Sequence, residues 1–328
     1  MRIDIVSVFP EYFDVLKLSL LGKAQDKGVL SVTAHNLRDW THDVHHSVDD
    51  TPVGGGAGMV MKPEIWAQCL DDIMGLAPVS FGDDNQPVQS RDFRLIGAND
   101  TTDTVNTADT AATADVTAND ADDANAAASS AEEAGTRTPN DSADASPKPI
   151  LIFPNPSAPL FTQADATGLS RADHLVFGCG RYEGIDARVP EYYARQGVEV
   201  REYSIGDYVL NGGEVAVSAM IEAIVRLMPG FMGNPESIVE ESYTGDPLLE
   251  HRQFTKPATW RGIAVDPVLT SGDHGKVDRF RRDEAMERTT RIRPDLVEEL
   301  DCKELSKADR KTLMALGWEV SGQHPRRK

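Results

Sequence analysis

Residues 178–189 read GCGRYEGIDARV, and residues 204–214 read SIGDYVLNGGE. Each stretch follows a short apolar run and places glycines beside carboxylates and an aromatic residue. Because glycine lacks a side chain, such a backbone can take up unusual turns and approach a flat ligand closely. Two loops of this kind predict a pocket built largely from main chain, which suits a nucleoside-like cofactor. Neither loop carries the G-x-G-x-x-G or G-x-x-x-x-G-K-[ST] pattern that binds phosphates.

The rest of the first two-thirds of the chain alternates between short strands and helices. Strands are predicted at 1–9, 29–34, 149–153, 174–177 and 198–203, and helices at 63–74 and 215–227. Several of these strands run directly into loops rich in glycine or proline. This order is typical of an α/β sheet whose ligand site lies at the carboxyl ends of the strands.

Residues 80–148 interrupt this pattern. From residue 98 onward the segment consists mainly of Ala, Thr, Asp, Asn and Ser, and residues 100–146 hold eleven acidic residues against Arg137 alone. That segment carries half of the net charge of −20. Such a composition cannot bury enough apolar surface to offset the entropy of the chain. We therefore expect an acidic, largely disordered insertion, with an interaction tail as the alternative.

The C-terminal part has a different charge balance. From Arg252 to the end, 17 basic residues face 13 acidic ones, which is compatible with RNA binding without demonstrating it. Charged segments at 278–286, 294–300 and 306–316 predict short helices, and so a small helical domain.

The composition argues against a membrane protein and a metalloprotein. No run of 18 apolar residues is present, and the N-terminus reads as a strand rather than a signal peptide. Three well-separated cysteines predict neither disulfides nor a metal site, so a reducing cytoplasm is expected. His42, His45 and His46 have no recognised ligand spacing and favour a polar loop.

Several charged residues near the loops are candidates for chemistry. Glu183 lies beside Arg181 and Tyr182, where the alternative is a set of weak surface ion pairs. Arg226 lies late on an apolar helix, where it contacts a phosphate or a base oxygen, or simply stabilises the helix end. Glu240 and Glu241 offer adjacent carboxylates, with solvated turn residues as the alternative.

These stretches, together with VFPEYF at 8–13 and THDVHHSVDDTPVGGGAGMVMKP at 41–63, resemble the bacterial tRNA (guanine-N1)-methyltransferases of the TrmD type. The resemblance covers roughly residues 1–75 and 150–320. It implies an α/β fold of the SPOUT class, with a parallel sheet, helices on both faces and a deep trefoil knot. Knots are rare in proteins, and no periodicity in the sequence predicts one. The implied domains are the knotted part at 1–79 and 149–245, the insertion at 80–148, and a helical tRNA-binding domain at 246–328.

The resemblance also implies an activity. S-adenosylmethionine would donate a methyl group to N1 of the guanine immediately 3′ of the anticodon, a modification that helps maintain the reading frame. The partner would be tRNA rather than DNA, with no membrane involved. The protein would be a cytoplasmic homodimer with each active site at the subunit interface. The family suggests Mg²⁺ as a possible second cofactor, although the sequence offers no metal site.

Residue roles are carried over from the same resemblance. Glu241 would remove the N1 proton, Arg226 would stabilise charge on O6, and Glu183 would lie near the guanine. The cofactor would be held by Phe153, Pro154, Asn155, Pro156, Cys179, Gly180, Tyr182, Gly184, Ser204, Ile205, Gly206, Tyr208, Leu210, Gly212 and Gly213. The substrate would be bound by Gly58, Arg181, Asp207, His251 and Arg252. Further phosphate contacts are expected from Lys256, Arg261, His274, Arg279, Arg281 and Arg282.

The sequence departs from the family pattern at three places. Glu241 stands where an aspartate is usual, and Glu240 competes for the role of base. Ala57 and Ala216 stand where prolines are common. Three other functions remain open: a related knotted methyltransferase acting on another RNA, a non-enzymatic RNA-binding protein, and an unrelated nucleotide-binding enzyme. The intact glycine loops and the missing dinucleotide fingerprint argue against the last two.

Overall fold

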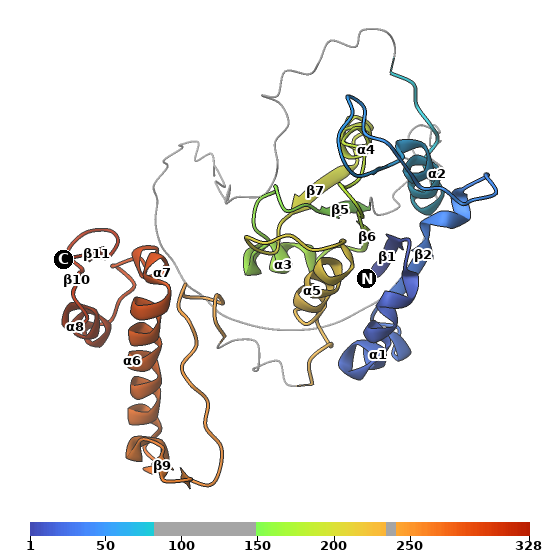
Figure 1. Cartoon of the computed structure of the whole chain (residues 1–328). Coiled ribbons are helices and arrows are strands. Elements are labelled where there is room, and N and C mark those ends of the chain that lie inside the picture. The colour runs from blue at the N-terminus through green and yellow to red at the C-terminus, as the bar shows by residue number, and fades with distance from the viewer. Residues whose placement is uncertain (82–148, 234–240) are drawn as a thin grey trace, which may run out of the picture. The chain divides into compact units, whose positions relative to one another are not determined.

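A five-stranded parallel sheet forms the centre of the fold in the computed structural model, which describes residues 1–81, 149–233 and 241–328 (Figure 1). The strand order is β2-β1-β6-β5-β7, and all four neighbouring pairs are parallel. The strands are β1 (Arg2–Ser7), β2 (Ser31–Asn36), β5 (Ile150–Pro154), β6 (His174–Gly178) and β7 (Glu199–Tyr203). The predicted α/β class with a parallel sheet is therefore confirmed.

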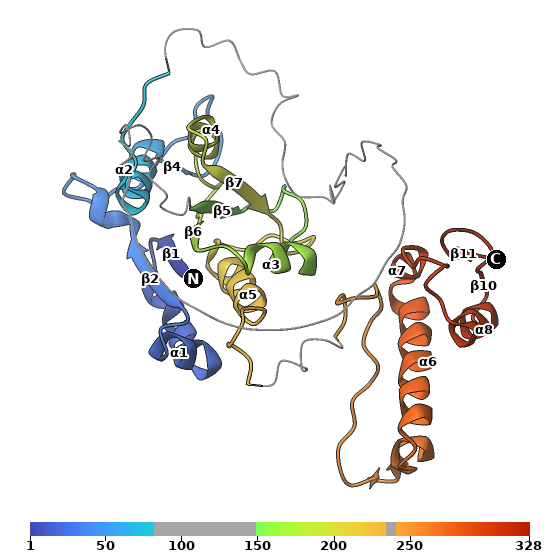
Figure 2. The ribbon, with the colours of Figure 1, turned by 180° about the vertical axis from the view of Figure 1, so that it is seen from behind.

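Helices cover both faces of this sheet (Figures 1 and 2). Alternate strand residues point to opposite faces, so Ile152 and Phe177 belong to one hydrophobic cluster while Leu151 and Val176 belong to another. The first cluster is completed by η1 (Pro10–Lys17), α1 (Ser19–Asp26), α3 (Gln163–Leu169) and α5 (Glu214–Val225). The second is completed by η2 (Leu37–Trp40), α2 (Pro63–Met74) and α4 (Arg188–Arg195).

Local sequence explains where these helices begin and end. Pro63 opens α2, where its missing N–H is not needed, and Gly75 closes it with a φ of 66°. Thr162 and Asp165 cap α3 reciprocally. Helix α5 begins at Glu214, immediately after the loop that follows β7. That loop is therefore held at one end by the sheet and at the other by a helix.

Two segments beside the sheet complete this part of the chain. A short antiparallel pair, β3 (Asp49–Asp50) and β4 (Val60–Met61), closes the glycine-rich loop at 51–59. Beyond α2 the chain contacts α4: the Val79 amide donates to the Tyr192 hydroxyl at 2.9 Å. The insertion predicted at 80–148 lies, apart from its first two residues, outside the described residues.

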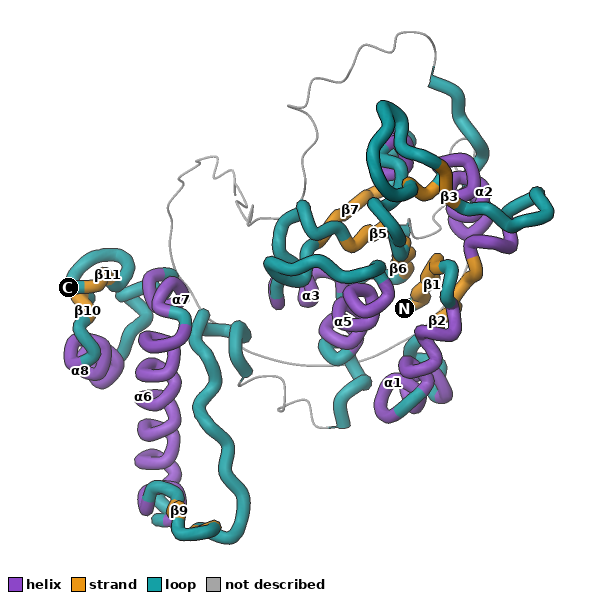
Figure 3. Tube along the Cα trace, viewed as in Figure 1, coloured by secondary structure: helices purple, strands orange, loops and turns teal. Residues whose placement is uncertain are grey.

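The C-terminal residues have a hydrophobic cluster of their own, which includes Leu248, Met286, Leu313 and Trp318. Its elements, drawn in orange and red in Figure 1 and by type in Figure 3, are mainly helical. They are β8 (Thr259–Trp260), β9 (Ile263–Ala264), η4 (Pro267–Thr270), α6 (His274–Ile292), α7 (Pro294–Glu298), α8 (Lys307–Ala315), β10 (Trp318–Glu319) and β11 (Arg326–Arg327). Helix α6 extends well beyond the predicted 278–286, because Asp273 caps it and its charged surface hides the periodicity. The domain boundaries themselves stay a prediction.

Within the described ranges, no helix is both long and apolar enough to cross a membrane.

Candidate active site

Three loops meet at one edge of the sheet because β6, β5 and β7 are parallel neighbours. The Asn155 amide, after β5, donates to the Tyr203 carbonyl at the end of β7, at 2.9 Å. The Gly213 amide donates to the Gly180 carbonyl, also at 2.9 Å, and so ties the loop after β7 to the loop after β6. The two glycine-rich stretches that the sequence singles out therefore lie side by side.

These loops enclose a cavity of about 630 Å³, which is the size of a typical small-molecule site. Most of the predicted cofactor residues line it: Phe153, Pro154, Asn155, Pro156, Gly180, Tyr182, Gly184, Ser204, Ile205, Tyr208, Leu210, Gly212 and Gly213. Glu183, predicted near the guanine, lines it as well. The expected pocket built largely from loop backbone is thus present at the carboxyl ends of the strands.

Two predicted cofactor residues lie behind the wall of this cavity. Cys179 is completely buried in the core, and this burial raises the pKa of its thiol well above the usual range. Gly206 lies directly under the ring of Tyr208, and a Cβ there would lie 2.5 Å from the nearest ring atom. Neither Cys179 nor Gly206 lines the cavity, whereas Tyr208, which packs against Gly206, does.

The cavity is lined by acidic residues. Glu183, Glu191 and Glu202 line it, while no Lys or Arg appears among the described lining residues. Asn155 donates to the Glu202 carboxylate at 3.0 Å and fixes its orientation. Glu191 is paired with Arg195, so Glu183 and Glu202 supply the negative charge of the lining. A partly enclosed site with such a lining favours a cationic ligand and disfavours one that carries phosphates.

Sequence reasoning missed ten of the lining residues: Ser157, Ile185, Ala187, Pro190, Glu191, Glu202, Tyr203, Val209, Asn211 and Ala216. Val209 and Asn211 lie inside the quoted SIGDYVLNGGE stretch, Ile185 and Ala187 lie inside the quoted GCGRYEGIDARV stretch, and Tyr203 ends a predicted strand, so a signal existed for these five. Pro190 and Glu191 lie in α4. Nothing in the local sequence marks them, because only the packing of α4 brings them to the cavity.

The glycine loop at 51–59 reaches the same site through Glu183. The Met59 amide donates to Glu183 Oε2 at 2.6 Å, and the Glu183 amide donates back to the Met59 carbonyl at 3.1 Å. Gly58 has a φ of 89°, and a Cβ on it would lie 1.7 Å from Glu183 Oε1. Gly58, predicted to bind substrate, is therefore the residue that leaves room for the Glu183 carboxylate.

Arg181 is held by a buried carboxylate. Its Nε lies 3.1 Å from Glu214 Oε1 and its Nη2 lies 3.0 Å from Glu214 Oε2. Ser7 donates to the same carboxylate at 2.7 Å, and the Arg181 guanidinium lies 4.6 Å from the centre of the Phe9 ring. The guanidinium is thus fixed from both sides beside Gly212, outside the cavity lining.

Arg226 and Glu241, the predicted catalytic pair, form an ion pair with each other. Arg226 Nη1 donates to Glu241 Oε2 at 2.6 Å, and Nη2 pairs with the other oxygen. The hydrogen bonds that Arg226 donates to the Glu241 carboxylate are the main reason that the pKa of Arg226 lies above its ordinary value. Neither residue lines the large cavity; Glu241 and His251 instead line a second hollow of about 330 Å³. Glu240, the alternative base, lies outside the described residues.

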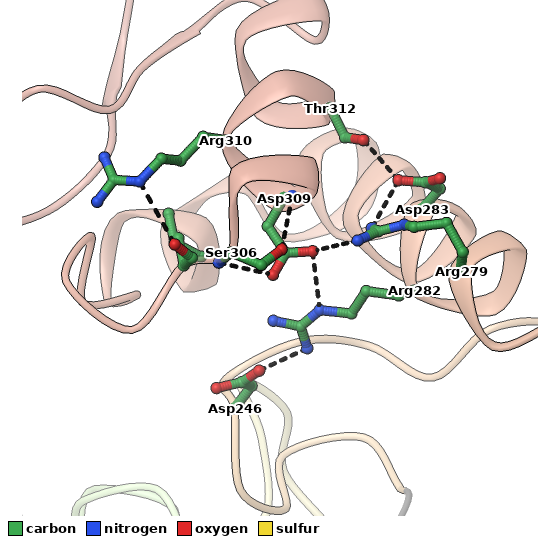
Figure 4. Close-up of polar contacts among 9 residues, drawn as sticks. Asp246, Arg279, Arg282, Asp283, Ser306, Asp309, Arg310 and Thr312 are labelled. Atoms are coloured by element: carbon green, nitrogen blue, oxygen red, sulfur yellow. Dashed lines mark hydrogen bonds and ion pairs between the residues drawn. The ribbon is translucent and has the colours of Figure 1, made fainter. Parts of the chain in front are cut away.

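Most of the predicted RNA-binding arginines are engaged within the C-terminal part (Figure 4). Arg279 bonds to Asp283 and Asp309, each at 2.7 Å, and Arg282 pairs with Asp246 at 2.5 Å. Arg252 pairs with Glu284, and Arg281 lies 3.8 Å from Asp278. Asp207 is exposed and does not line the large cavity.

The described part of the chain contains no cluster of three or more His, Cys, Asp or Glu residues that could hold a metal ion. His42 instead contacts the Gln68 side chain at 3.1 Å, and His46 contacts the Thr41 hydroxyl at 2.8 Å.

Fold and site together define an α/β protein with a cavity at the carboxyl ends of its parallel strands, lined by glycine-rich loops and glutamates. The family model described as tRNA (guanine-1)-methyltransferase TrmD matches residues 1–80 and 130–299. The tRNA (guanine-N(1)-)-methyltransferase of Bifidobacterium longum (strain DJO10A) is 66% identical over 328 residues, which cover 100% of this chain and 99% of that protein. The one from Bifidobacterium adolescentis is 67% identical, with 100% of each chain covered.

A more distant relative extends the same result. The tRNA (guanine-N(1)-)-methyltransferase of Arthrobacter sp. (strain FB24) is 45% identical over 100% of this chain and 96% of that protein. The chain therefore belongs to the tRNA (guanine-1)-methyltransferase family. The resemblance noted in the sequence and the methyltransferase assignment are both confirmed.

Proposed function

We propose that this protein transfers the methyl group of S-adenosylmethionine to N1 of a guanine in tRNA, the one immediately 3′ of the anticodon. The observation that carries the proposal is the acid-lined cavity formed by the two glycine-rich loops. S-adenosylmethionine is cationic at its sulfonium and carries no phosphate, so it suits this lining, whereas a dinucleotide does not. Family membership supports the same reaction.

The residues present fit this cofactor. Backbone atoms of the loops at 178–189 and 204–213 would contact its flat base, and Glu183 and Glu202 would favour its positive charge. When bound, S-adenosylmethionine supplies an electrophilic methyl group on a sulfonium centre. The SPOUT class of the family implies that the chain is knotted around this site, which we include in the proposal.

The Arg226–Glu241 pair complements one edge of guanine. That edge presents the O6 acceptor beside the N1–H donor, while the pair presents guanidinium donors beside a carboxylate acceptor. Glu241 would accept the N1 proton as N1 forms its bond to the methyl group, and Arg226 would stabilise the negative charge that builds on O6. In this arrangement the edge of the guanine would take the place of the direct ion pair between Arg226 and Glu241.

A homodimer would bring this pair to the cofactor. Within one chain, Arg226 and Glu241 do not line the large cavity. We propose that they face the cavity of a partner subunit, so that each active site contains residues from both chains. Cytoplasmic location and a role in maintaining the reading frame follow from the proposed substrate. The suggested Mg²⁺ requirement can be checked by adding EDTA to the methylation assay.

Methyl transfer from labelled S-adenosylmethionine to unmodified tRNA tests the proposed function. We expect incorporation into tRNA that carries guanine 3′ of the anticodon, and none when adenine replaces that guanine. Mapping of the product to N1 distinguishes this reaction from methylation of a ribose hydroxyl. Incorporation that is independent of this guanine would show that the protein acts on another site.

A further inference from the structure

A small β-hairpin in the C-terminal part exposes large apolar side chains. In the hairpin of β8 and β9, Trp260 pairs with Ile263, and their exposed fractions are 59% and 71%. Phe254, just before the hairpin, is 47% exposed. None of the three belongs to the hydrophobic cluster of this part of the chain. Exposed apolar side chains that lie together, as those of Trp260 and Ile263 do, commonly mark a binding surface.

The turn of the hairpin holds a cation against the aromatic ring. Arg261 and Gly262 occupy the two turn positions with φ of 53° and 82°, as in the tight turns that match the twist of paired strands. The Arg261 guanidinium lies 4.9 Å from the centre of the Trp260 ring. The tip therefore presents a flat aromatic surface and a positive charge together.

The charge around this tip is unusual for such an acidic chain. No Asp or Glu occurs between Glu250 and Asp266, although the whole chain carries a net charge of −20. Arg252, within this stretch, is paired with Glu284. The salt bridges found among the described residues include neither Lys256 nor Arg261. Within the part of the chain that the structure describes, these two cations therefore have no carboxylate partner, unlike Arg279 and Arg282 of α6 in Figure 4.

We propose that the hairpin at 259–264 binds a single-stranded loop of the RNA substrate, with an unpaired base stacked on Trp260 and a backbone phosphate near Arg261 and Lys256. Single-stranded RNA is recognised by this combination of an aromatic platform and a positive strip, because every base has a flat face and every linkage is anionic. The inference rests on the proposed function for the identity of the RNA as tRNA, and it adds a binding surface outside the site of methyl transfer.

Tryptophan fluorescence and equilibrium binding of the full chain to unmodified tRNA test this proposal. Trp66 and Trp318 are fully buried and Trp40 is half-buried, so quenching by stacked bases should come mainly from Trp260. We expect Trp260→Ala to lose most of the quenching and to weaken tRNA binding about tenfold or more, as stacking on one base predicts. Trp260→Phe, which keeps a flat ring, should lose the quenching but retain most of the affinity.

Matched measurements separate this proposal from the proposed function. Met314→Ala removes an exposed apolar side chain from α8 and should bind tRNA as the wild type does. The affinity of Trp260→Ala for S-adenosylmethionine should be unchanged.

Wild-type tRNA affinity in Trp260→Ala would overturn the hairpin proposal even if methyl transfer occurs. The hairpin proposal would also fail if Trp260 fluorescence fell with rising protein concentration in the absence of RNA, because the hairpin would then contact a second copy of the chain. Absence of methyl transfer from an enzyme whose hairpin still binds tRNA would instead overturn the proposed function alone.

Discussion

At the scale of single residues, a glycine decides where a site carboxylate lies. Gly58 has φ of 89° and leaves no room for a Cβ beside Glu183, whose carboxylate it faces. In the same loop Gly54 has a similar φ of 92°, yet a Cβ there would meet nothing within 4 Å. The two glycines therefore share the backbone requirement, and only Gly58 also shapes the site.

Gly58→Ala should lower methyl transfer while Gly54→Ala should not. Both changes carry the strain of a positive φ, on the order of 1 kcal/mol of unfolding free energy. Only Gly58→Ala also displaces Glu183 from the Met59 amide, and loss of a charge-assisted hydrogen bond predicts roughly a tenfold fall in kcat/KM. Steady-state kinetics and urea denaturation of both variants check this, and equal activity in the two would show that the Glu183 position is unimportant.

Glu241 is the residue on which the proposed chemistry depends. Glu241→Gln keeps hydrogen-bonding atoms beside Arg226 but cannot take up a proton, so turnover should fall by about 100-fold or more. Calorimetry should show unchanged uptake of S-adenosylmethionine, because Glu241 does not line the large cavity. Glu240→Gln is the matched control and should stay active. An inactive Glu240→Gln together with an active Glu241→Gln would show that Glu240 is the base.

At the scale of elements, one buried aspartate joins three strands. Asp4 of β1 is 1% exposed, and its carboxylate lies 2.7 Å from His35 Nε2 on β2 and 2.8 Å from His174 Nε2 on β6. Arg2 Nε lies 2.6 Å away. Burial alone would raise the pKa of Asp4, but hydrogen bonds from His174, His35 and Arg2 outweigh it and hold the pKa well below its ordinary value of 3.8.

Asp4→Asn should therefore destabilise the fold in a pH-dependent way. Because the folded pKa is depressed, the contribution of Asp4 is present above its unfolded pKa and is lost as the pH falls below about 3.8. At neutral pH we expect a loss of about 2 kcal/mol in the free energy of unfolding. Urea denaturation of wild type and variant should show this difference shrinking towards about pH 3. If the difference in the free energy of unfolding stayed constant over this range, the charge of Asp4 would not contribute to stability.

At the scale of the whole molecule, the cavity depends on a limited part of the chain. Among the described residues, all that line it fall in the range from Phe153 to Ala216. Deletion of residues 99–146 should leave S-adenosylmethionine affinity and methyl transfer within about twofold of wild type, because a segment of this composition cannot bury much apolar surface. Calorimetry and the methylation assay check this. A folded but inactive deletion variant would show that the acidic segment takes part in function.

Sharing of the active site between subunits can be tested with mixed dimers. One subunit would carry Glu241→Gln, and the other Leu210→Trp, a cavity change first verified to abolish S-adenosylmethionine binding. If each site combines the cavity of one chain with Glu241 of the other, a purified mixed dimer keeps one intact site and about half the wild-type rate. Each variant alone should be inactive. An inactive mixed dimer would place Glu241 and the cavity of the same site in one chain.

The sequence by itself determined the five strands of the central sheet, the glycine loops and the family, because these depend on local patterns: apolar periodicity, glycine spacing and contiguous motifs. It predicted most of the cavity lining for the same reason. Only the tertiary structure decided that Glu202 lines the cavity together with Glu183, that Asp4 joins β1 to both neighbours, that Arg226 pairs with Glu241, and that acids engage most of the C-terminal arginines predicted to contact RNA. Each of these depends on side chains from separate elements meeting in space. Charge, burial and hydrogen bonding at such meetings are set by packing, which a local sequence pattern does not contain.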